Sequence, residues 1–267
     1  MSRLMCGLWF ALAACGGGGG FPDAPESDSA GPTGTFSVTW SVVDQNSQPI
    51  SCDTVSAQAM TVLAHNLAIE GGSTQIFSCN TGMGMSQGLA PGDYEMNFEL
   101  SSGMFGALGM AAKQAPVAIT ANANLELAPV TFQVEAHGGI ALKLATGKPN
   151  CDAVSAGGAG ITAMTITLNH NSDLTCEPIT LSISDGVTQP GGMYTINCTT
   201  PMTRVCIEEN QTITAMGVPS DSYTIRVKGY VGANLCYLNA DSIQVPPLNK
   251  LLLGTLNLGQ QTQTPGC

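Results

Sequence analysis

The chain has 267 residues, of which 43% are hydrophobic and only 10% are charged. Its 19 acidic side chains outnumber 8 basic ones, which gives a net charge of -11. A nucleic-acid-binding face needs clustered Lys and Arg, so this composition argues against nucleic acid as a partner. The 32 Gly and 15 Pro favour a turn-rich β protein over a helical one.

The first fifteen residues, MSRLMCGLWFALAAC, have the pattern of a bacterial export signal. One basic residue, Arg3, precedes an apolar run that is too short for a permanent transmembrane helix. The segment Leu12–Gly16 matches the lipobox, before whose Cys lipoprotein signal peptidase cleaves. The chain therefore resembles bacterial lipoproteins. This resemblance implies that the signal peptide 1–14 is removed and that Cys15 is lipidated.

The lipid on Cys15 would determine where the protein is located in the cell. Each buried methylene group contributes about 0.8 kcal/mol, so several acyl chains on one residue anchor a protein firmly. The residue that follows this Cys is Gly16 rather than Asp. By the usual sorting rule for lipoproteins, a residue other than Asp at this position points to the outer membrane. Residues 15–34 are rich in Gly, Pro and Ser and are typical of a flexible tether. We expect a lipid-anchored outer-membrane protein that faces the periplasm or the cell surface.

An internal repeat organises the rest of the chain. The segment Cys52–Ala57 matches Cys151–Ala156 at five of six positions, and the similarity continues through the apolar segments that follow. The repeat is about 100–125 residues long, which is the size of a domain and too long for a solenoid unit. The expected parts are a first domain at 35–135, a second domain at 136–260 and a C-terminal tail at 261–267.

Alternation of apolar and polar residues predicts β-strands in both halves. It is clearest in four segments, and no helical period extends beyond about two turns. Several short strands separated by Gly and Pro within about 100 residues predict a β-sandwich. The predicted fold is all-β, with two tandem Ig-like or prealbumin-like sandwich domains. The four alternating segments are residues 36–42, 94–100, 179–183 and 223–228.

The turn segment Leu89–Tyr94, with the sequence LAPGDY, opens one of these strands. It resembles the turn of the carboxypeptidase-regulatory-like, transthyretin-like and collagen-adhesin B sandwich families. In those families the Tyr hydrogen-bonds back across the turn, which implies the same role for Tyr94 and Tyr223. The second copy of the turn lacks the Gly. Over its full length the chain resembles outer-membrane lipoproteins of myxobacterial type, a resemblance that implies no activity.

Of the ten Cys, one leaves with the signal peptide and one is the lipidated Cys15, so eight remain. An even number in an oxidising compartment predicts disulfides, and the lack of a Cys-x-x-Cys motif disfavours a metal or redox site. Matching positions in the repeat predict two pairs, Cys52–Cys79 and Cys151–Cys198. The other four Cys allow three connectivities, of which the first choice is Cys176–Cys206 with Cys236–Cys267.

Metal-ligating residues are few. Zinc would need His65, His137 and His170 to converge, but His65 and His170 are repeat equivalents, and a strand-end His that contacts a turn is the preferred interpretation. Met83 and Met85 could bind copper(I), which accepts thioethers. Core filling or a mobile loop is the preferred interpretation of these Met residues. We expect no resident metal and no cofactor.

No set of catalytic residues can be assembled from the sequence, and it contains no EF-hand loop. The acidic pair Glu208-Glu209 would point to opposite sides of a strand, so we interpret it as loop charge. The segment 220–222, Ser-Asp-Ser, has no His near it in the sequence.

The sequence therefore predicts a non-enzymatic, membrane-anchored envelope lipoprotein that acts as a structural, adhesive or binding module. Its expected partners are the membrane, through the lipid on Cys15, and an extracellular carbohydrate or protein that the sequence does not identify. One alternative is an envelope protein that binds a ligand or a metal through the Met and His residues named above. A second alternative is an enzyme of unrecognised type.

Overall fold

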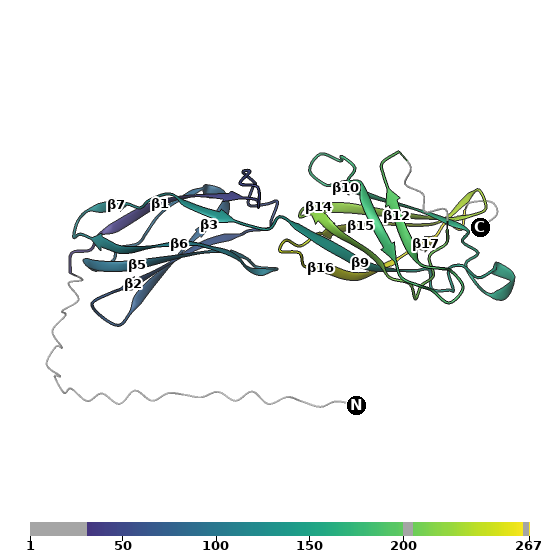
Figure 1. Ribbon diagram of the computed structural model, residues 1–267, viewed down its shortest axis with the longest axis horizontal. Coiled ribbons are helices and arrows are strands. Elements are labelled where there is room, and N and C mark those ends of the chain that lie inside the picture. The colour runs from purple at the N-terminus through teal and green to yellow at the C-terminus, as the bar shows by residue number, and fades with distance from the viewer. Residues whose placement is uncertain (1–30, 200–204, 264–266) are drawn as a thin grey trace, which may run out of the picture. The chain divides into compact units, whose positions relative to one another are not determined.

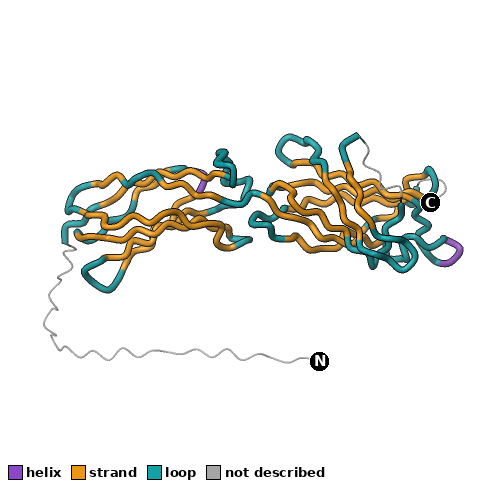
Figure 2. The backbone as a smooth tube through the Cα atoms, viewed as in Figure 1, coloured by secondary structure: helices purple, strands orange, loops and turns teal. Residues whose placement is uncertain are grey.

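The computed structural model describes residues 31–199, 205–263 and 267 (Figure 1). The signal peptide, Cys15 and most of the expected tether lie outside the described residues. The described chain consists of strands and loops, apart from two single-turn 3-10 helices at Cys79–Thr81 and Val154–Ala156 (Figure 2). Within the described residues, no helix is long and apolar enough to span a bilayer. The predicted all-β fold class is confirmed.

Eight strands form the first half of the described chain. They are β1 (Thr35–Val43), β2 (Ala59–Asn66), β3 (Gly72–Ser78), β4 (Met83–Met85), β5 (Gly92–Ser102), β6 (Gly106–Ile119), β7 (Asn124–Glu126) and β8 (Val130–Gln133). One sheet has the order β4-β1-β7, with β8 also paired to β1, and the other has the order β3-β2-β5-β6. Strand β1 is antiparallel to β4 but parallel to β7 and β8.

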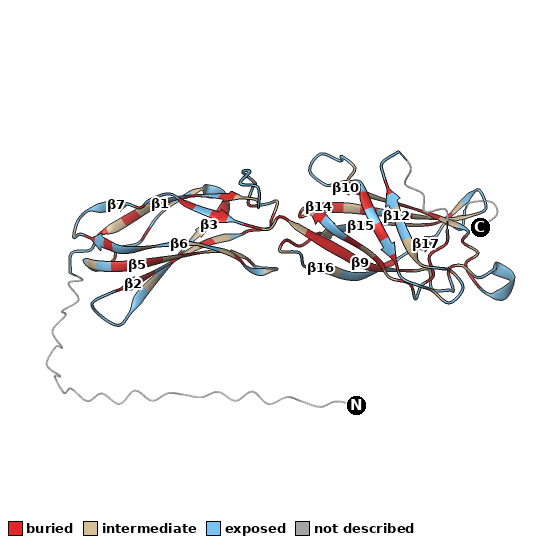
Figure 3. Ribbon diagram, viewed as in Figure 1, coloured by how far each residue is buried: buried red, intermediate tan, exposed pale blue. Residues whose placement is uncertain are grey.

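Alternating side chains of these strands build the first core. Phe36 and Val38 of β1 face Phe98 and Leu100 of β5 across the sandwich, and all four are at most 1% exposed. Figure 3 shows the resulting stripes of buried residues along the strands. Burial of one such side chain contributes about 1.5–3 kcal/mol. The period-two pattern in the sequence therefore corresponds to an inner and an outer face of each sheet.

Nine strands form the second half. They are β9 (His137–Ala145), β10 (Ala163–His170), β11 (Ile179–Ile183), β12 (Gly192–Ile196), β13 (Ile213–Pro219), β14 (Ser222–Val231), β15 (Asn234–Gln244), β16 (Leu251–Asn257) and β17 (Gly259–Gln260). The sheets have the orders β12-β11-β13-β9-β16 and β10-β14-β15-β17. A second core, separate from the first, includes Ile140, Met164 and the fully buried Tyr223.

The two halves repeat one pattern of strand pairing. The order β2-β5-β6 in the first half corresponds to β10-β14-β15 in the second, and β4-β1 corresponds to β13-β9. The final strands β7 and β8 run parallel to β1 as β16 runs parallel to β9. The halves differ after β2 and β10, because β3 joins β2 whereas the hairpin β11–β12 joins the opposite sheet. Independent folding of the halves as two domains stays a prediction.

Four disulfides link the eight Cys of the described chain. Cys52–Cys79 and Cys236–Cys267 are the pairs expected from the sequence. The expected pairs Cys151–Cys198 and Cys176–Cys206 are wrong, because Cys151 is bonded to Cys206 and Cys176 to Cys198.

The β11–β12 hairpin explains this difference. Cys176 precedes β11 and Cys198 follows β12, and the antiparallel register pairs Ile179 with Ile196, so the hairpin ends bring the two Cys together. The first half has no such hairpin, and the repeat alignment therefore matched Cys198 to the wrong position. Disulfides form and persist in oxidising compartments, so the four bonds indicate an extracytoplasmic protein.

Candidate functional site

The predicted tyrosine contacts are confirmed in both halves. The hydroxyl of Tyr94 donates a hydrogen bond to the carbonyl oxygen of Ala90 at 2.9 Å, and that of Tyr223 donates to the carbonyl oxygen of Pro219 at 2.9 Å. In the second half, which lacks the Gly of the LAPGDY turn, Gly217 adopts a positive φ of 71°. The burial of Tyr223 raises the pKa of its hydroxyl, which stays a hydrogen-bond donor. These tyrosines lock the turns before β5 and β14.

Met83 and Met85 lie on one outward face of β4. Their side chains are 65% and 66% exposed, so the preferred interpretation that they fill core gaps or sit in a mobile loop is wrong. Gly84 between them faces inward, where an added Cβ would lie 2.3 Å from the ring of Phe77. The two thioethers are a surface feature of an edge strand.

The structure does not gather the predicted metal ligands. Met83 is on β4, His65 is exposed on β2, and His170 ends β10, which places them in three different sheets. His137 Nδ1 lies 2.9 Å from Glu135 Oε1. Within the part of the chain that the structure describes, no three His, Cys, Asp or Glu side chains are arranged to hold a metal ion.

His170 is the centre of a polar cluster that the sequence did not reveal. Its Nδ1 lies 2.7 Å from Asp221 Oδ2, in the turn between β13 and β14. Its Nε2 lies 3.3 Å from Glu177 Oε2, in the segment between β10 and β11. The ring also packs on Tyr223, with centroids 4.5 Å apart. The expected contact of a strand-end His with a turn is thus confirmed for His170.

The charge state of His170 follows from these contacts. Burial disfavours the charged ring, but the hydrogen bonds and negative charges of Asp221 and Glu177 outweigh it and raise the pKa of His170. Both ring nitrogens face a carboxylate, so neither is open to a substrate proton or a metal. The cluster joins the β10–β11 segment to the β13–β14 turn and has the geometry of a structural clamp.

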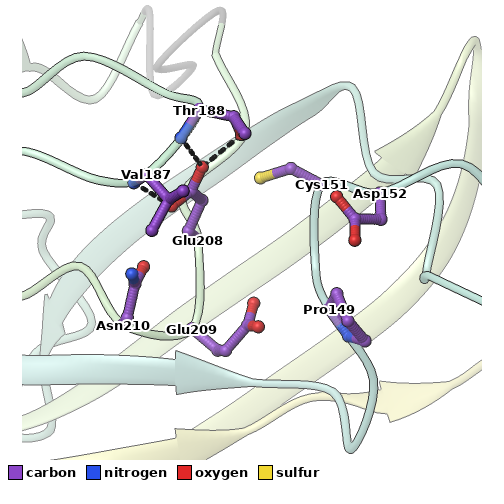
Figure 4. Close-up of a pocket in the computed structure, with 8 residues that line it drawn as sticks. All are labelled: Pro149, Cys151, Asp152, Val187, Thr188, Glu208, Glu209 and Asn210. Atoms are coloured by element: carbon purple, nitrogen blue, oxygen red, sulfur yellow. Dashed lines mark hydrogen bonds between the residues drawn. The ribbon is translucent and has the colours of Figure 1, made fainter.

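A cleft of about 250 Å³ lies among the loops of the second half (Figure 4). Its walls come from the segment after β9, the loop between β11 and β12, and the segment before β13. The disulfide Cys151–Cys206 ties the first of these segments to the third. The lining residues are Pro149, Cys151, Asp152, Val187, Thr188, Glu208, Glu209 and Asn210.

Glu208 holds the loop above the cleft. Its carboxylate accepts backbone N–H bonds from Val187 at 2.7 Å and Thr188 at 2.7 Å, and also a bond from the Thr188 hydroxyl (Figure 4). It accepts a further bond from the backbone N–H of Gln189 at 2.9 Å. These donors, the Thr188 hydroxyl first, keep the pKa of Glu208 below its usual value. Glu208 lies in a loop, as expected, but its side chain is only 7% exposed and its carboxylate is fully engaged in hydrogen bonds.

Amide side chains hold the other walls. The Asn150 side chain is fully buried and donates to the carbonyl oxygens of Leu144 and Ile207, each at 2.9 Å. The backbone N–H of Asn150 donates to Glu209 Oε2 at 2.9 Å. The carboxylates of Asp152 and Glu209 point into the cleft (Figure 4). Chemically, this arrangement offers carboxylate oxygens to hydroxyl or ammonium groups, on walls fixed by a disulfide and buried amides.

No protein-family model and no curated protein matches the chain. Among solved structures, the chain is similar to the Bacillus anthracis TIE protein, at 8% identity and a TM-score of 0.38, over 86% of this chain and 34% of that one. It is similar to the shaft pilin SpaA from Lactobacillus rhamnosus GG, at 9% identity and a TM-score of 0.30, over 86% of this chain and 98% of that one. It is also similar to the major pilin from Streptococcus pyogenes, at 8% identity and a TM-score of 0.29, over 85% and 98%. The chain spans about a third of the first of these proteins.

Proposed function

We propose that this protein is a lipid-anchored, non-enzymatic module of the bacterial cell envelope, with a structural or adhesive role. In this proposal, acyl chains on Cys15 hold it in the outer membrane, and residues 16–34 space two tandem β-sandwich domains from the bilayer. The observation that carries it is the lipobox Leu12–Gly16 ahead of a disulfide-bonded β protein. An export signal and a set of disulfides require the same oxidising compartment.

The use of polar groups supports a scaffold. His170 clamps two loops, Glu208 binds three successive backbone N–H groups, and Asn150 bridges two carbonyl oxygens. The hydrogen bonds of each of these buried or half-buried groups fix a loop in place. In a rigid scaffold, interior polar groups are satisfied by hydrogen bonds of this kind. A scaffold that presents rigid loops and polar strand faces suits a structural or adhesive role.

Metabolic labelling with a palmitate analogue tests the anchor. The wild-type protein should carry the label and fractionate with the outer membrane, whereas Cys15→Ser should lose the label and the membrane association. Cys6→Ser is the matched control, because Cys6 lies before the cleavage site and should leave both unchanged. Label on Cys15→Ser, or release of the wild type into the soluble fraction, would contradict the proposal.

Protease treatment of intact cells then tests the role. Digestion of the wild type from outside would place the sandwiches on the cell surface and support an adhesive role. Protection until the outer membrane is permeabilised would place them in the periplasm and leave the structural role. Turnover of ester, peptide or glycoside substrates by the purified protein would refute a non-enzymatic module.

A further inference from the structure

The outward faces of β5 and β14 carry opposite charges. These two strands occupy the same place in the repeated pattern of strand pairing. The outward side chains of β5 include Glu95 and Glu99, whereas those of β14 include Arg226 and Lys228. Only 8 of the 267 residues are Lys or Arg, so two of them on one strand face form a local concentration of positive charge.

The acidic face belongs to the sheet β3-β2-β5-β6. There Glu95 is paired with Lys113 at 2.7 Å. Glu99 is partly buried, and no described residue forms an ion pair or a side-chain hydrogen bond with it. It borders a hollow of about 240 Å³ whose walls include Leu63 and Met110, which are 47% and 70% exposed. A carboxylate beside apolar walls suits a side chain with an aliphatic stem and a cationic head.

The basic face belongs to the sheet β10-β14-β15-β17. Arg226 lies between Thr167 and Ala240 in register, and Lys228 lies between the corresponding Thr and Leu residues of β10 and β15. These neighbours carry no negative charge. No residue in the described ranges forms an ion pair with Arg226 or Lys228. The face therefore presents two unpaired cations among small and apolar side chains.

We propose that copies of this protein bind one another head to tail through these two faces. The face of β3-β2-β5-β6 on one copy packs on the face of β10-β14-β15-β17 on the next, and Arg226 enters the hollow to pair with Glu99. Sheets that pack face to face lie about 10 Å apart, a gap that an Arg side chain from one sheet and a Glu side chain from the other bridge together. Because each copy uses two different faces, one of each kind remains free and further copies can add, giving an open chain or, where the rotation between copies closes, a ring.

Charge selects a second copy as the occupant. The net charge of -11 makes copies repel unless a local attraction aligns them, and among the described strands β14 is the only one that carries two basic side chains. The opposite charges on the equivalent strands β5 and β14 supply that attraction. They also fix which strand of one copy lies on which strand of the next. This assembly does not depend on the lipid anchor, so loss of label in Cys15→Ser and loss of association are separate outcomes.

Charge reversal on each face tests the proposal on the full-length protein in detergent. Sedimentation velocity should show concentration-dependent association of the wild type. We expect Glu99→Arg, and separately the double variant Arg226→Glu with Lys228→Glu, to weaken association by at least about tenfold, because each brings like charges together. Mixing the two variants should restore association, since each retains the face that the other lacks. Restoration also shows that both variants are folded.

Two control variants reverse charge on the other sheets. Glu126→Lys on β7 and Lys143→Glu on β9 should leave association unchanged. A carbodiimide should also crosslink Glu99 to Lys228 between ¹⁴N- and ¹⁵N-labelled copies. A wild type that stays monomeric, controls that weaken association as strongly as Glu99→Arg, or variants that do not associate when mixed would each overturn the proposal.

Discussion

Tyr94 and Tyr223 make the same contact in the two halves of the chain. Each hydroxyl donates to the carbonyl oxygen four residues earlier, that of Ala90 or of Pro219, and both bonds measure 2.9 Å. Each Tyr also fills the core beneath its turn. Both copies of the sequence repeat therefore form the same tyrosine hydrogen bond across the turn, although the residues between the carbonyl and the Tyr differ.

Removal of either hydroxyl should lower the free energy of unfolding. We expect Tyr94→Phe and Tyr223→Phe each to cost about 0.5–1.5 kcal/mol, because each leaves a turn carbonyl without its donor. If the halves are independent domains, urea denaturation should show two transitions, with each variant shifting only one. The matched control is Tyr230→Phe on the outward face of β14, which should have little effect. A single transition shifted equally by both variants would contradict the two-domain prediction.

The contact of His170 with Asp221 and Glu177 should make stability depend on pH. The folded-state pKa of His170 is raised, so its contribution is fully present below the unfolded value of about 6.5 and is lost as pH rises through the folded value. Urea denaturation of the wild type and His170→Gln between pH 5.5 and 9 should therefore give curves that converge at high pH. His65→Gln is the control, since His65 is exposed on β2. A difference that grows with pH would reverse the assignment.

The alternation of apolar and polar residues predicted the strands, because strand positions depend on residues close together in the sequence. The alternation in residues 36–42 and 94–100 reports which side chains face a core, and the strands form there. The β11–β12 hairpin joins the opposite sheet from its counterpart β3, and this choice depends on packing between segments far apart in sequence. The expected pairing of Cys198 failed for that reason. The contact between His170 and Asp221 spans 51 positions, and no periodicity reports it.

Glu208 should be essential for the order of the loop above the cleft. Its folded pKa is lowered, so its contribution is present above the unfolded value of about 4.3 and is lost as pH falls through the folded value. Glu208→Gln replaces a carboxylate that accepts several bonds with an amide that has one acceptor oxygen. Hydrogen exchange at the amides of Val187, Thr188 and Gln189 should become faster in this variant. Glu209→Gln should leave these three amides protected, and equal exchange in both variants would contradict the role of Glu208.

The disulfide pairing can be read from the thiol that each single substitution frees. Cys151→Ser should leave Cys206 free for alkylation, whereas a free Cys198 would restore the pairing expected from the repeat. Replacing both Cys176 and Cys198 by Ala should lower the free energy of unfolding by about 3 kcal/mol. Without the bond, the unfolded chain gains the conformational entropy that the bond withholds from a loop of that length. Its loss should loosen the β11–β12 hairpin first, since the bond closes the open end of that hairpin. The control is Cys52→Ala with Cys79→Ala, which should lower stability while the amides of β11 stay protected.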